Sequence, residues 1–378
     1  MKFLVRVIEI GHIVAGPSAG LIFADLGYDV IKIEKPGEGD IARRLTHSSS
    51  GAFPFYNRGK RSLTVDLGSD GGKEVFLRLS RTADIIIDNL GFGAMKRLGL
   101  SYDNLSQGNS RLIYLSIKGY GSGPLERRKS LDFPIEIHSG IAYMTGLSGR
   151  PMRVGGSMVD MGAAMFGVIQ ALQAIIDRER TGRGRFIDIG LFETALFFMG
   201  QHISSYQINR TELRPINEEG FAWAIYDFFP TADGKEIFIA VTTDTQWKEF
   251  CSRLKLGICG EKIYEKNESR FEHMETLKKI ISSRTGDMPT ETLTSMLDGM
   301  NIPYSFLNRP WDLLNDKQAQ PKLVNEIYAG LNLKVPTIPD RTLATGDPPS
   351  LGEGNDEILG SLGFSPEEIT GLRKSSCI

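Results

Sequence analysis

Short runs of β-branched and apolar residues alternate with helical segments, and this alternation is the feature that most restricts the fold of the chain. The runs lie at residues 3–10, 30–33, 83–88 and 112–117, and another follows a long helical segment at residues 186–191. Repeats of strand, helix and strand form parallel sheets with helical crossovers. We therefore expect an α/β fold built on a large parallel sheet.

The first repeat also has one property of a dinucleotide-binding unit, because an acidic residue, Glu34, ends its second strand. The glycines of the first turn and helix are Gly11, Gly16 and Gly20, which are five and four residues apart. This spacing does not match the G-x-G-x-x-G pattern that brings a backbone close to a pyrophosphate. NAD binding is therefore not expected.

The charge of the chain is nearly balanced, with 44 lysines and arginines against 46 acidic residues. No overall field attracts nucleic acid or a membrane surface, so an anion site must be built locally. Cys251, Cys259 and Cys377 form no metal-type cluster, and an odd, small number of cysteines suits a reducing compartment. Neither a signal peptide nor an apolar run of spanning length is evident. We expect a soluble cytoplasmic protein.

The character of the sequence changes after about residue 200, which indicates a second domain. A turn of hairpin type at residues 231–234 separates two strand patterns, and three helical patterns follow. We expect a large domain over residues 1–205, a linker over 206–223 and a smaller α+β domain over 224–321. Residues 322–378 would form a second linker and a C-terminal helix that returns to the large domain.

The segment from Gly155 to Glu193 predicts a loop, a helix and a strand, with Asp160 at the point where the loop becomes the helix. Apolar residues recur at helical spacing on one face: Met165, Val168, Ile169, Leu172 and Ile176. Gly182 and Gly184 are predicted to end the helix. Asp160 has two interpretations. It is a helix cap, because aspartate is a preferred residue at that position. Alternatively it is a nucleophile, because a carboxylate at a helix N-terminus is held ionised.

A basic loop with Asn57, Arg58 and Lys60 precedes the strand that ends near Leu67. It is either a solvated turn or an anion cradle, since guanidinium and ammonium groups with loop N–H donors suit phosphate. Asn89 follows the strand at residues 83–88, at the end of a parallel sheet where ligands usually bind. His138 lies in an apolar helical stretch and is expected to be a packed or partly buried histidine.

Several segments, in one order along nearly the whole chain, resemble the family III CoA transferases. That group includes the formyl-CoA and carnitine CoA transferases and the related α-methylacyl-CoA racemases. The matching segments are AGP at 15–17, ADLGYDVIKIEKPGEGD at 24–40, NRGKRSLTVDL at 57–67, ADIIIDN at 83–89, LIYLSIKGYG at 112–121, the Asp160 helix with ERTGRGRFIDIGLFE at 179–193, and SLGEGNDEILGSLGF at 350–364. One such segment would be a weak signal, but their common order is specific.

The resemblance implies a large Rossmann-like domain with a smaller α+β domain, in an interlocked homodimer whose chains thread each other. It implies that Asp160 is the catalytic aspartate that becomes acylated. The residues that it places at the CoA site are Val14, Ala15, Lys35, Asn57, Arg58, Lys60, Asn89, Leu90, Arg97, Lys129 and Asp132, the last of them close to the nucleophile.

The implied activity moves CoA from an acyl-CoA thioester to a free carboxylic acid, through an acyl-aspartyl anhydride and an aspartyl-CoA thioester at Asp160. CoA is a substrate here, and no cofactor is needed. Val14 replaces the glutamine of formyl-CoA transferase, and residues 217–223 (NEEGFAW) are bulkier than its glycine-rich lid, so neither oxalate nor formate is expected. Leu131 takes the place of the racemase histidine, which disfavours a racemase or epimerase. A non-catalytic CoA-binding paralogue is the remaining alternative.

Overall fold

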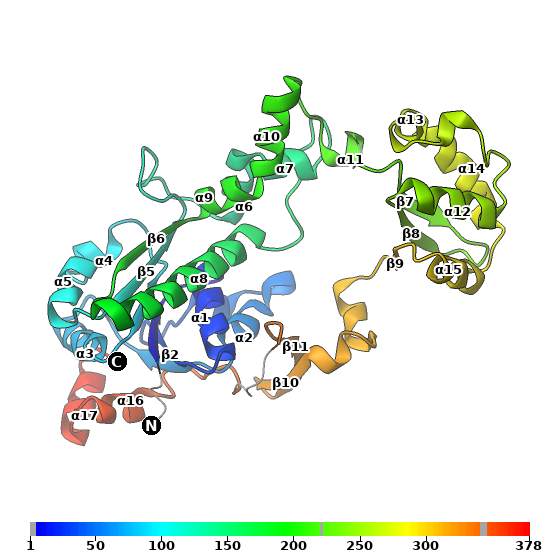
Figure 1. Cartoon of the computed structure of the whole chain (residues 1–378). Helices are drawn as coiled ribbons and strands as arrows, with labels where there is room; N and C mark the ends of the chain where they lie inside the picture. Colours follow the sequence, from blue (N-terminus) through cyan, green and yellow to red (C-terminus); the bar gives the residue numbers. More distant parts are fainter. Residues whose placement is uncertain (1–4, 220–221, 341–345) are drawn as a thin grey trace. The chain divides into compact units, whose positions relative to one another are not determined.

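A computed structural model describes residues 5–219, 222–340 and 346–378 of the chain (Figure 1). The described residues divide into two compact units. Of these, the first contains residues 5–143, 151–212, 321–340 and 346–378, and the second contains residues 144–150, 213–219 and 222–320. The short segment 144–150 is the main difference from the division expected from sequence, which assigned it to the large domain.

The first unit is built on a six-stranded sheet in which all neighbouring strands are parallel. Its strands, in the order in which they lie side by side, are β3 (Arg61–Thr64), β2 (Asp29–Glu34), β1 (Arg6–Ile10), β4 (Ile85–Asp88), β5 (Ile113–Lys118) and β6 (Phe186–Gly190). The expected α/β class with a parallel sheet is therefore confirmed. Successive side chains of a strand point to opposite faces, so Val7 and Ile8 enter two different cores.

Helices cover both faces of this sheet. One core contains residues of α1 (Ala15–Asp25), α8 (Met158–Thr181) and α9 (Leu191–Phe198), and Figure 1 shows α1 and α8 in front of the strands. The opposite core contains residues of α3 (Asp70–Ser80), α5 (Tyr102–Gly108), α16 (Asn355–Ser361) and α17 (Pro366–Lys374). Shorter helices connect these elements: α2 (Ala52–Asn57), α4 (Ala94–Arg97), α6 (Asp132–Ser139), α7 (Ile141–Thr145) and α10 (Gly200–Asn209). The short helix α11 (Ile216–Glu219) belongs to the second unit.

The second unit is a small α+β structure. Its antiparallel sheet joins β7 (Ile225–Pro230), β8 (Glu236–Val241) and β9 (Tyr304–Phe306), and the hairpin expected around residues 231–234 is confirmed. Its helices are α12 (Asp244–Leu254), α13 (Asn267–Glu272), α14 (Met274–Gly286) and α15 (Thr290–Gly299). Cys251 and Cys259 form a disulfide in this unit, with Cα atoms 5.6 Å apart, whereas Cys377 is free. The sequence did not indicate that pairing.

Two segments expected to be linkers contain regular structure. Residues 206–209 continue α10 as helix, which corrects the crossing segment expected to begin at Tyr206. Within residues 322–378, an antiparallel hairpin forms from β10 (Leu323–Tyr328) and β11 (Leu331–Pro336). The segment 217–223, compared above with a lid, includes residues 220–221, which lie outside the described residues.

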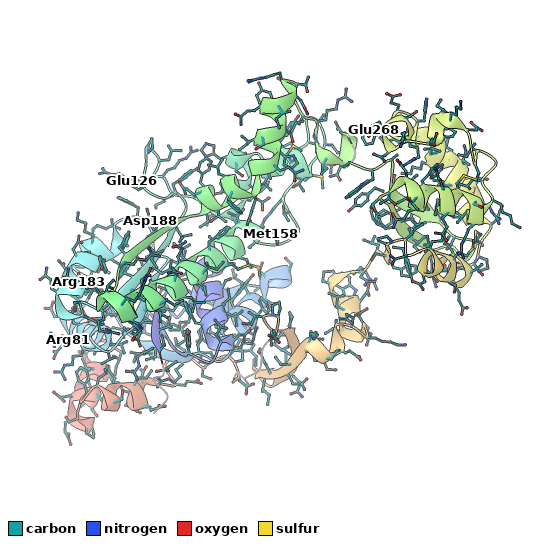
Figure 2. The ribbon with its side chains drawn as sticks, in the orientation of Figure 1. Arg81, Glu126, Met158, Arg183, Asp188 and Glu268 are labelled. Carbon is teal, nitrogen blue, oxygen red and sulfur yellow. A yellow bond between two sulfur atoms is a disulfide. The ribbon has the colours of Figure 1, made fainter. Side chains whose placement is uncertain are left out.

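The longest helix, α8, differs from expectation in which of its faces is buried. Most of its buried residues are small, and the full set is Val159, Gly162, Ala163, Ala164, Gly167, Val168, Ala171, Ala174 and Arg178. Met165, Ile169 and Ile176, expected to be core, are more than half exposed. Figure 2 marks Met158 at the start of this helix and Arg183 just beyond its end. Within the described ranges, α8 is the one helix long and apolar enough to cross a membrane, a test that core helices of soluble proteins also pass.

Candidate active site

The strand order places a topological switch point between β1 and β4. From β1 the chain continues to β2 on one side, and from β4 it continues to β5 on the other, so the loops after both strands lie where open α/β sheets usually bind a ligand in a crevice. Asn89, directly after β4, accepts a hydrogen bond from the His12 N–H at 3.4 Å. A Cβ on Gly16 would lie only 2.8 Å from the Cβ of Asn89, so only glycine allows this close approach of α1 to the β4 loop.

Asp160 lies in the first turn of α8 and is partly buried. It is the third residue of the helix rather than its cap. The cap comes from another helix: one carboxylate oxygen of Asp132, in α6, accepts the N–H groups of Val159 and Asp160, both at 3.0 Å. Among the described residues, none donates a hydrogen bond to the Asp160 side chain itself. The capping interpretation of Asp160 is therefore wrong, and its carboxyl is left available for chemistry.

The surroundings of Asp160 make it hard to ionise. Burial and, after it, the nearby negative charge of Asp132 raise the pKa of Asp160 to about 7, while Arg153 opposes both effects. The guanidinium of Arg153 lies 3.3 Å from Asp132 and is half exposed. A carboxyl with a pKa near neutrality changes protonation state in the range where the protein works, which is typical of functional sites.

Three residues near Asp160 were missed by the sequence analysis: Glu136, Tyr56 and Arg153. Glu136 is fully buried one helical turn after Asp132, and accepts the Val154 N–H at 3.0 Å. Burial and the adjacent Asp132 raise the pKa of Glu136 to about 7. Burial, Asp160 and Asp132 together raise the pKa of the Tyr56 phenol, which places the hydroxyl in the field of both carboxylates. The four-residue spacing of Asp132 and Glu136 was the one available signal.

Leu131 and His138 flank this group of carboxyls. Leu131 directly precedes α6 and is 69% exposed, so the position compared with the racemase histidine holds no acid or base. His138 is exposed, which corrects the expected partial burial, but its ring is packed, as was also expected. Its ring stacks on Phe192 with centroids 4.7 Å apart, and its Nδ1 lies 3.0 Å from the Tyr120 hydroxyl.

Five of the residues proposed to contact CoA from the sequence are open to solvent in part or fully. Lys35 is exposed and pairs with Glu38 at 2.5 Å, and Arg97 and Lys129 are exposed. Asn89 and Leu90, which follow β4, are partly exposed. Val14 and Ala15 begin α1 and are buried, at 9% and 3% exposure. The side chains of these two residues are therefore not free to contact a ligand.

The basic loop has a different role from the expected phosphate cradle. The Arg58 guanidinium is buried and pairs with Asp25 at 2.5 Å and with Glu326 at 3.2 Å. Lys60 is also buried and pairs with Glu9 at 2.5 Å. The third residue, Asn57, is fully buried and accepts a hydrogen bond from the Lys60 ammonium at 3.0 Å. All three side chains take part in internal contacts that hold the sheet to its surrounding loops, which corrects the expectation that they form a cradle open to a ligand.

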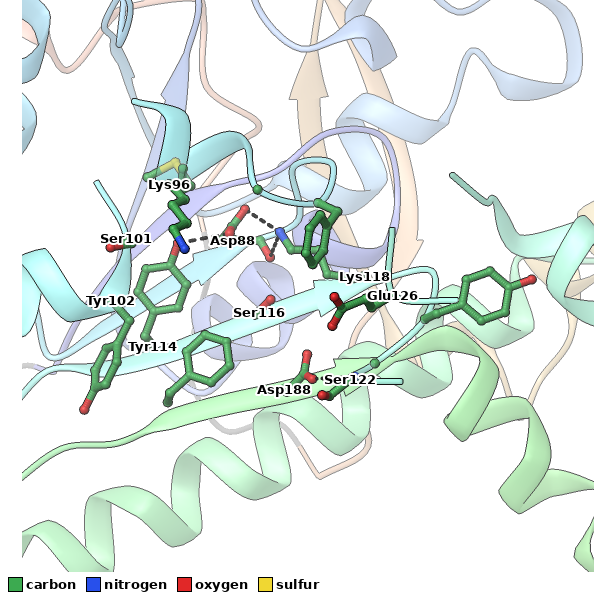
Figure 3. A pocket seen from close by; sticks show the side chains of 16 residues that line it. Asp88, Lys96, Ser101, Tyr102, Tyr114, Ser116, Lys118, Ser122, Glu126 and Asp188 are labelled. Atoms are coloured by element: carbon green, nitrogen blue, oxygen red, sulfur yellow. Dashed lines mark hydrogen bonds and ion pairs between the residues drawn. The ribbon is translucent and has the colours of Figure 1, made fainter. Parts of the chain in front are cut away.

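A cavity of about 310 Å³ lies beside α4 and along β5 and β6 (Figure 3). Asp160 is not among its lining residues, so this cavity is separate from the group of carboxyls around Asp160. Figure 3 shows Lys118 on its wall, paired with Asp88 at 2.8 Å. The same ammonium donates a hydrogen bond to the Leu90 carbonyl at 2.5 Å, so it holds the main chain of the loop after β4 in place.

Comparison with known proteins gives this arrangement a family. The model of CoA-transferase family III matches residues 5–355, which is most of the chain. The chain belongs to CoA-transferase family III. The resemblance noted from its segments is thereby confirmed, and the chain is a CoA-transferase of this family.

Curated relatives of this family III chain are similar over most of its length. It is 31% identical to the succinate–glutarate CoA-transferase of Agrobacterium fabrum, covering 95% of this chain and 94% of the relative. It is also 31% identical to the succinyl-CoA:mesaconate CoA-transferase of Haloarcula hispanica, covering 82% and 81%. A crystal structure of a CAIB/BAIF family protein from Brucella suis superimposes with a TM-score of 0.82 at 29% identity, over 95% of this chain and 98% of that one.

Proposed function

We propose that this family III transferase moves CoA between two carboxylic acids by covalent catalysis at Asp160. The observation that carries the proposal is a carboxyl in the first turn of α8 that receives no hydrogen bond from the described residues, while Asp132 caps the same helix. The crevice at the β1–β4 switch point would receive the acyl-CoA, and Lys35, Arg97 and Lys129 would attract its phosphates from exposed positions.

The reaction begins when an ionised oxygen of Asp160 attacks the thioester carbonyl of the donor. The carbon–sulfur bond breaks, CoA leaves as a thiolate, and a mixed anhydride remains. The thiolate then attacks the Asp160 carbonyl, which releases the donor acid and forms an aspartyl-CoA thioester. The acceptor carboxylate repeats both steps in reverse and regains the Asp160 carboxylate. Splitting the exchange in this way replaces one difficult step by easier ones and conserves the thioester energy, without a metal or redox cofactor.

We further propose that the donor is a dicarboxylic acyl-CoA. The curated relatives described above are named for succinyl-CoA or succinate together with a second diacid. In this chain Arg153 is half exposed beside Asp132, so its remaining N–H donors would bind the far carboxylate of such an acyl group. Arg153→Met would then raise the KM for succinyl-CoA and leave the KM for a monocarboxylic acyl-CoA unchanged. Equal KM changes for both donors would contradict this role.

A homodimer is part of the proposal. The outer face of α8 and the neighbouring helices expose large apolar side chains: Met165, Ile169, Ile176, Phe197, Tyr206 and Ile208. Apolar side chains gathered in this way are typical of an interface. We expect the mass in solution, measured by light scattering, to be that of two chains. A concentration-independent monomer would contradict it. A cytoplasmic location is likewise an expectation.

The test traps the anhydride. Incubation with succinyl-CoA and hydroxylamine should convert Asp160 to a hydroxamate, which peptide mass spectrometry locates, and should inactivate the enzyme. Asp160→Asn should abolish both labelling and transfer, whereas Asp177→Asn, in the last turns of the same helix, should change neither. Full transfer by Asp160→Ala would refute the proposal. Exchange of the substrate α-proton with deuterium and no labelling would indicate a racemase, and CoA binding without turnover on a panel of acids would indicate a non-catalytic paralogue.

A further inference from the structure

The turn that joins β1 to α1 has a strained backbone. Ile13 has a φ of 66°, and the N–H of Val14 donates to the carbonyl of His12 at 3.0 Å. A bond between residues two apart around a positive-φ centre is the rare, strained form of γ-turn. Positive φ is a genuine outlier for a β-branched residue, because its Cβ crowds the backbone. Glycine or asparagine would adopt this turn far more readily.

A buried ion cluster holds the strained turn on one side. Both oxygens of Asp40 lie within hydrogen-bond reach of the Ile13 N–H, at 3.2 and 3.3 Å. Asp40 is itself fixed, because it is fully buried, pairs with Lys32 at 2.9 Å and accepts the Ala42 N–H at 2.8 Å. Lys32 is held in turn by Glu9 at 2.8 Å. This cluster determines the conformation of Ile13 from outside the turn.

The β4 loop holds the turn on the other side. The Asn89 side chain accepts from His12, and Gly16 approaches Asn89 as closely as a glycine permits. Behind the turn, Ala15 and Ala19 of α1 share a core with Val159 and Ala163 of α8, the helix that carries Asp160. The strained residue therefore lies at the switch point and is connected through packed helices to the proposed nucleophile. Strain held by its surroundings at such a place indicates a functional role.

We propose that Asp40 is a positioning residue, which acts through the strained Ile13 turn to fix the main chain of residues 12–15 against the acyl-CoA. This inference rests on the proposed function, since it concerns how the same crevice aligns the thioester with Asp160. A relaxed turn would let the backbone at the start of α1 move. The carbonyl carbon would then spend less time in line with the attacking carboxylate, and such misalignment lowers the rate steeply.

Ile13→Gly separates this role from a purely structural one. Glycine removes the strain, so we expect a thermal midpoint equal to or above that of the parent chain. We expect kcat for CoA transfer to fall on the order of tenfold, with a smaller change in KM. Lys255→Gly is the matched control, because Lys255 has a φ of 55° at the end of α12 in the second unit. It should also raise the midpoint and leave kcat unchanged.

Asp40→Asn supplies the second variant, since its amide oxygen still accepts from Ile13 but no longer pairs with Lys32. We expect it to lower kcat, and we expect the double variant with Ile13→Gly to lose no more kcat than the worse single variant. If Asp40→Asn does not fold, Ile13→Gly decides alone, and a kcat/KM equal to that of the parent overturns the proposal.

The proposed function can fail without ending this test. If the parent chain transfers CoA to no acid, the dissociation constant of free CoA, measured by calorimetry, replaces kcat as the readout. We then expect weaker binding by Ile13→Gly, at least threefold, and no change for Lys255→Gly. Equal dissociation constants for the parent and Ile13→Gly would overturn the positioning role.

Discussion

Replacing the nucleophile by a neutral side chain of the same shape should stabilise the folded protein. In the fold, the pKa of Asp160 rises from the ordinary 3.8 to about 7, chiefly through burial and then through the charge of Asp132. The folded state therefore binds more protons than the unfolded state between about pH 4 and pH 7, and stability falls as the pH rises through that window. Asp160→Asn removes a carboxyl that must otherwise be ionised inside the protein.

The size of the effect follows from the shift. Each unit of pKa is worth about 1.4 kcal/mol, so three units give a ceiling of about 4 kcal/mol above pH 7. Screening by water at this partly exposed position lowers it, and we expect a gain of about 2–4 kcal/mol at pH 8. Below about pH 4 the carboxyl is protonated in both states, and the gain should shrink to under about 1 kcal/mol.

Urea unfolding followed by circular dichroism at pH 4, 6 and 8 measures the gain directly. Asp177→Asn is the control on the same helix, because hydrogen bonding to Arg180 lowers the pKa of Asp177 instead, and its neutralisation should give no gain at pH 8. The reasoning fails if Asp160→Asn has the same effect at pH 4 and pH 8, or if it destabilises the protein at pH 8.

Three further results are expected. The kcat/KM for acyl-CoA should rise with pH through about 7, as Asp160 becomes ionised, and Arg153→Met should displace that profile to higher pH; a profile flat from pH 6 to 9 would contradict this. Lys32→Met should lower the free energy of unfolding by about 3–5 kcal/mol, because it leaves the buried carboxylates of Glu9 and Asp40 without their shared cation. Lys35→Met, which removes an exposed ion pair with Glu38, is the control and should leave the urea midpoint unchanged. Gly16→Ala should weaken CoA binding, measured by calorimetry, because its Cβ displaces the β4 loop; unchanged affinity would contradict a ligand site there.

The parallel sheet could be predicted from sequence because its signals are local. The runs of β-branched residues that form β1, β4 and β5 need no information from distant parts of the chain. The hairpin of β10 and β11 was missed because β10 (LVNEIY) has no alternating pattern, although Leu331, Leu333 and Val335 of β11 do alternate with polar residues. The helical period of α8 was also evident, but a period does not state which face meets the sheet. Small residues on that face allow α1 to approach closely, so the large apolar residues remain outside.

The basic loop shows why charged residues are harder to interpret than apolar ones. Arg58 and Lys60 suggested an anion site because their partners are far away in sequence: Asp25, Glu9 and Glu326. Only the fold brings these carboxylates to the two cations. The pKa of Asp160 has the same origin, since burial and Asp132 are properties of packing between α6 and α8. The catalytic candidate could be named from the sequence, but its electrostatic setting could not.

The order of synthesis constrains how this protein can fold. Strand β3 and the residues just after it are held by residues that emerge about three hundred positions later: the side chain of Asn355 bonds to Thr64, and the carbonyl of Cys377 accepts the N–H of Asp66. Residues 213–320 of the second unit are translated in between. During translation, the nascent sheet must therefore leave its β3 side uncovered until that second unit has left the ribosome, and this is the interval in which a chaperone would be of most use.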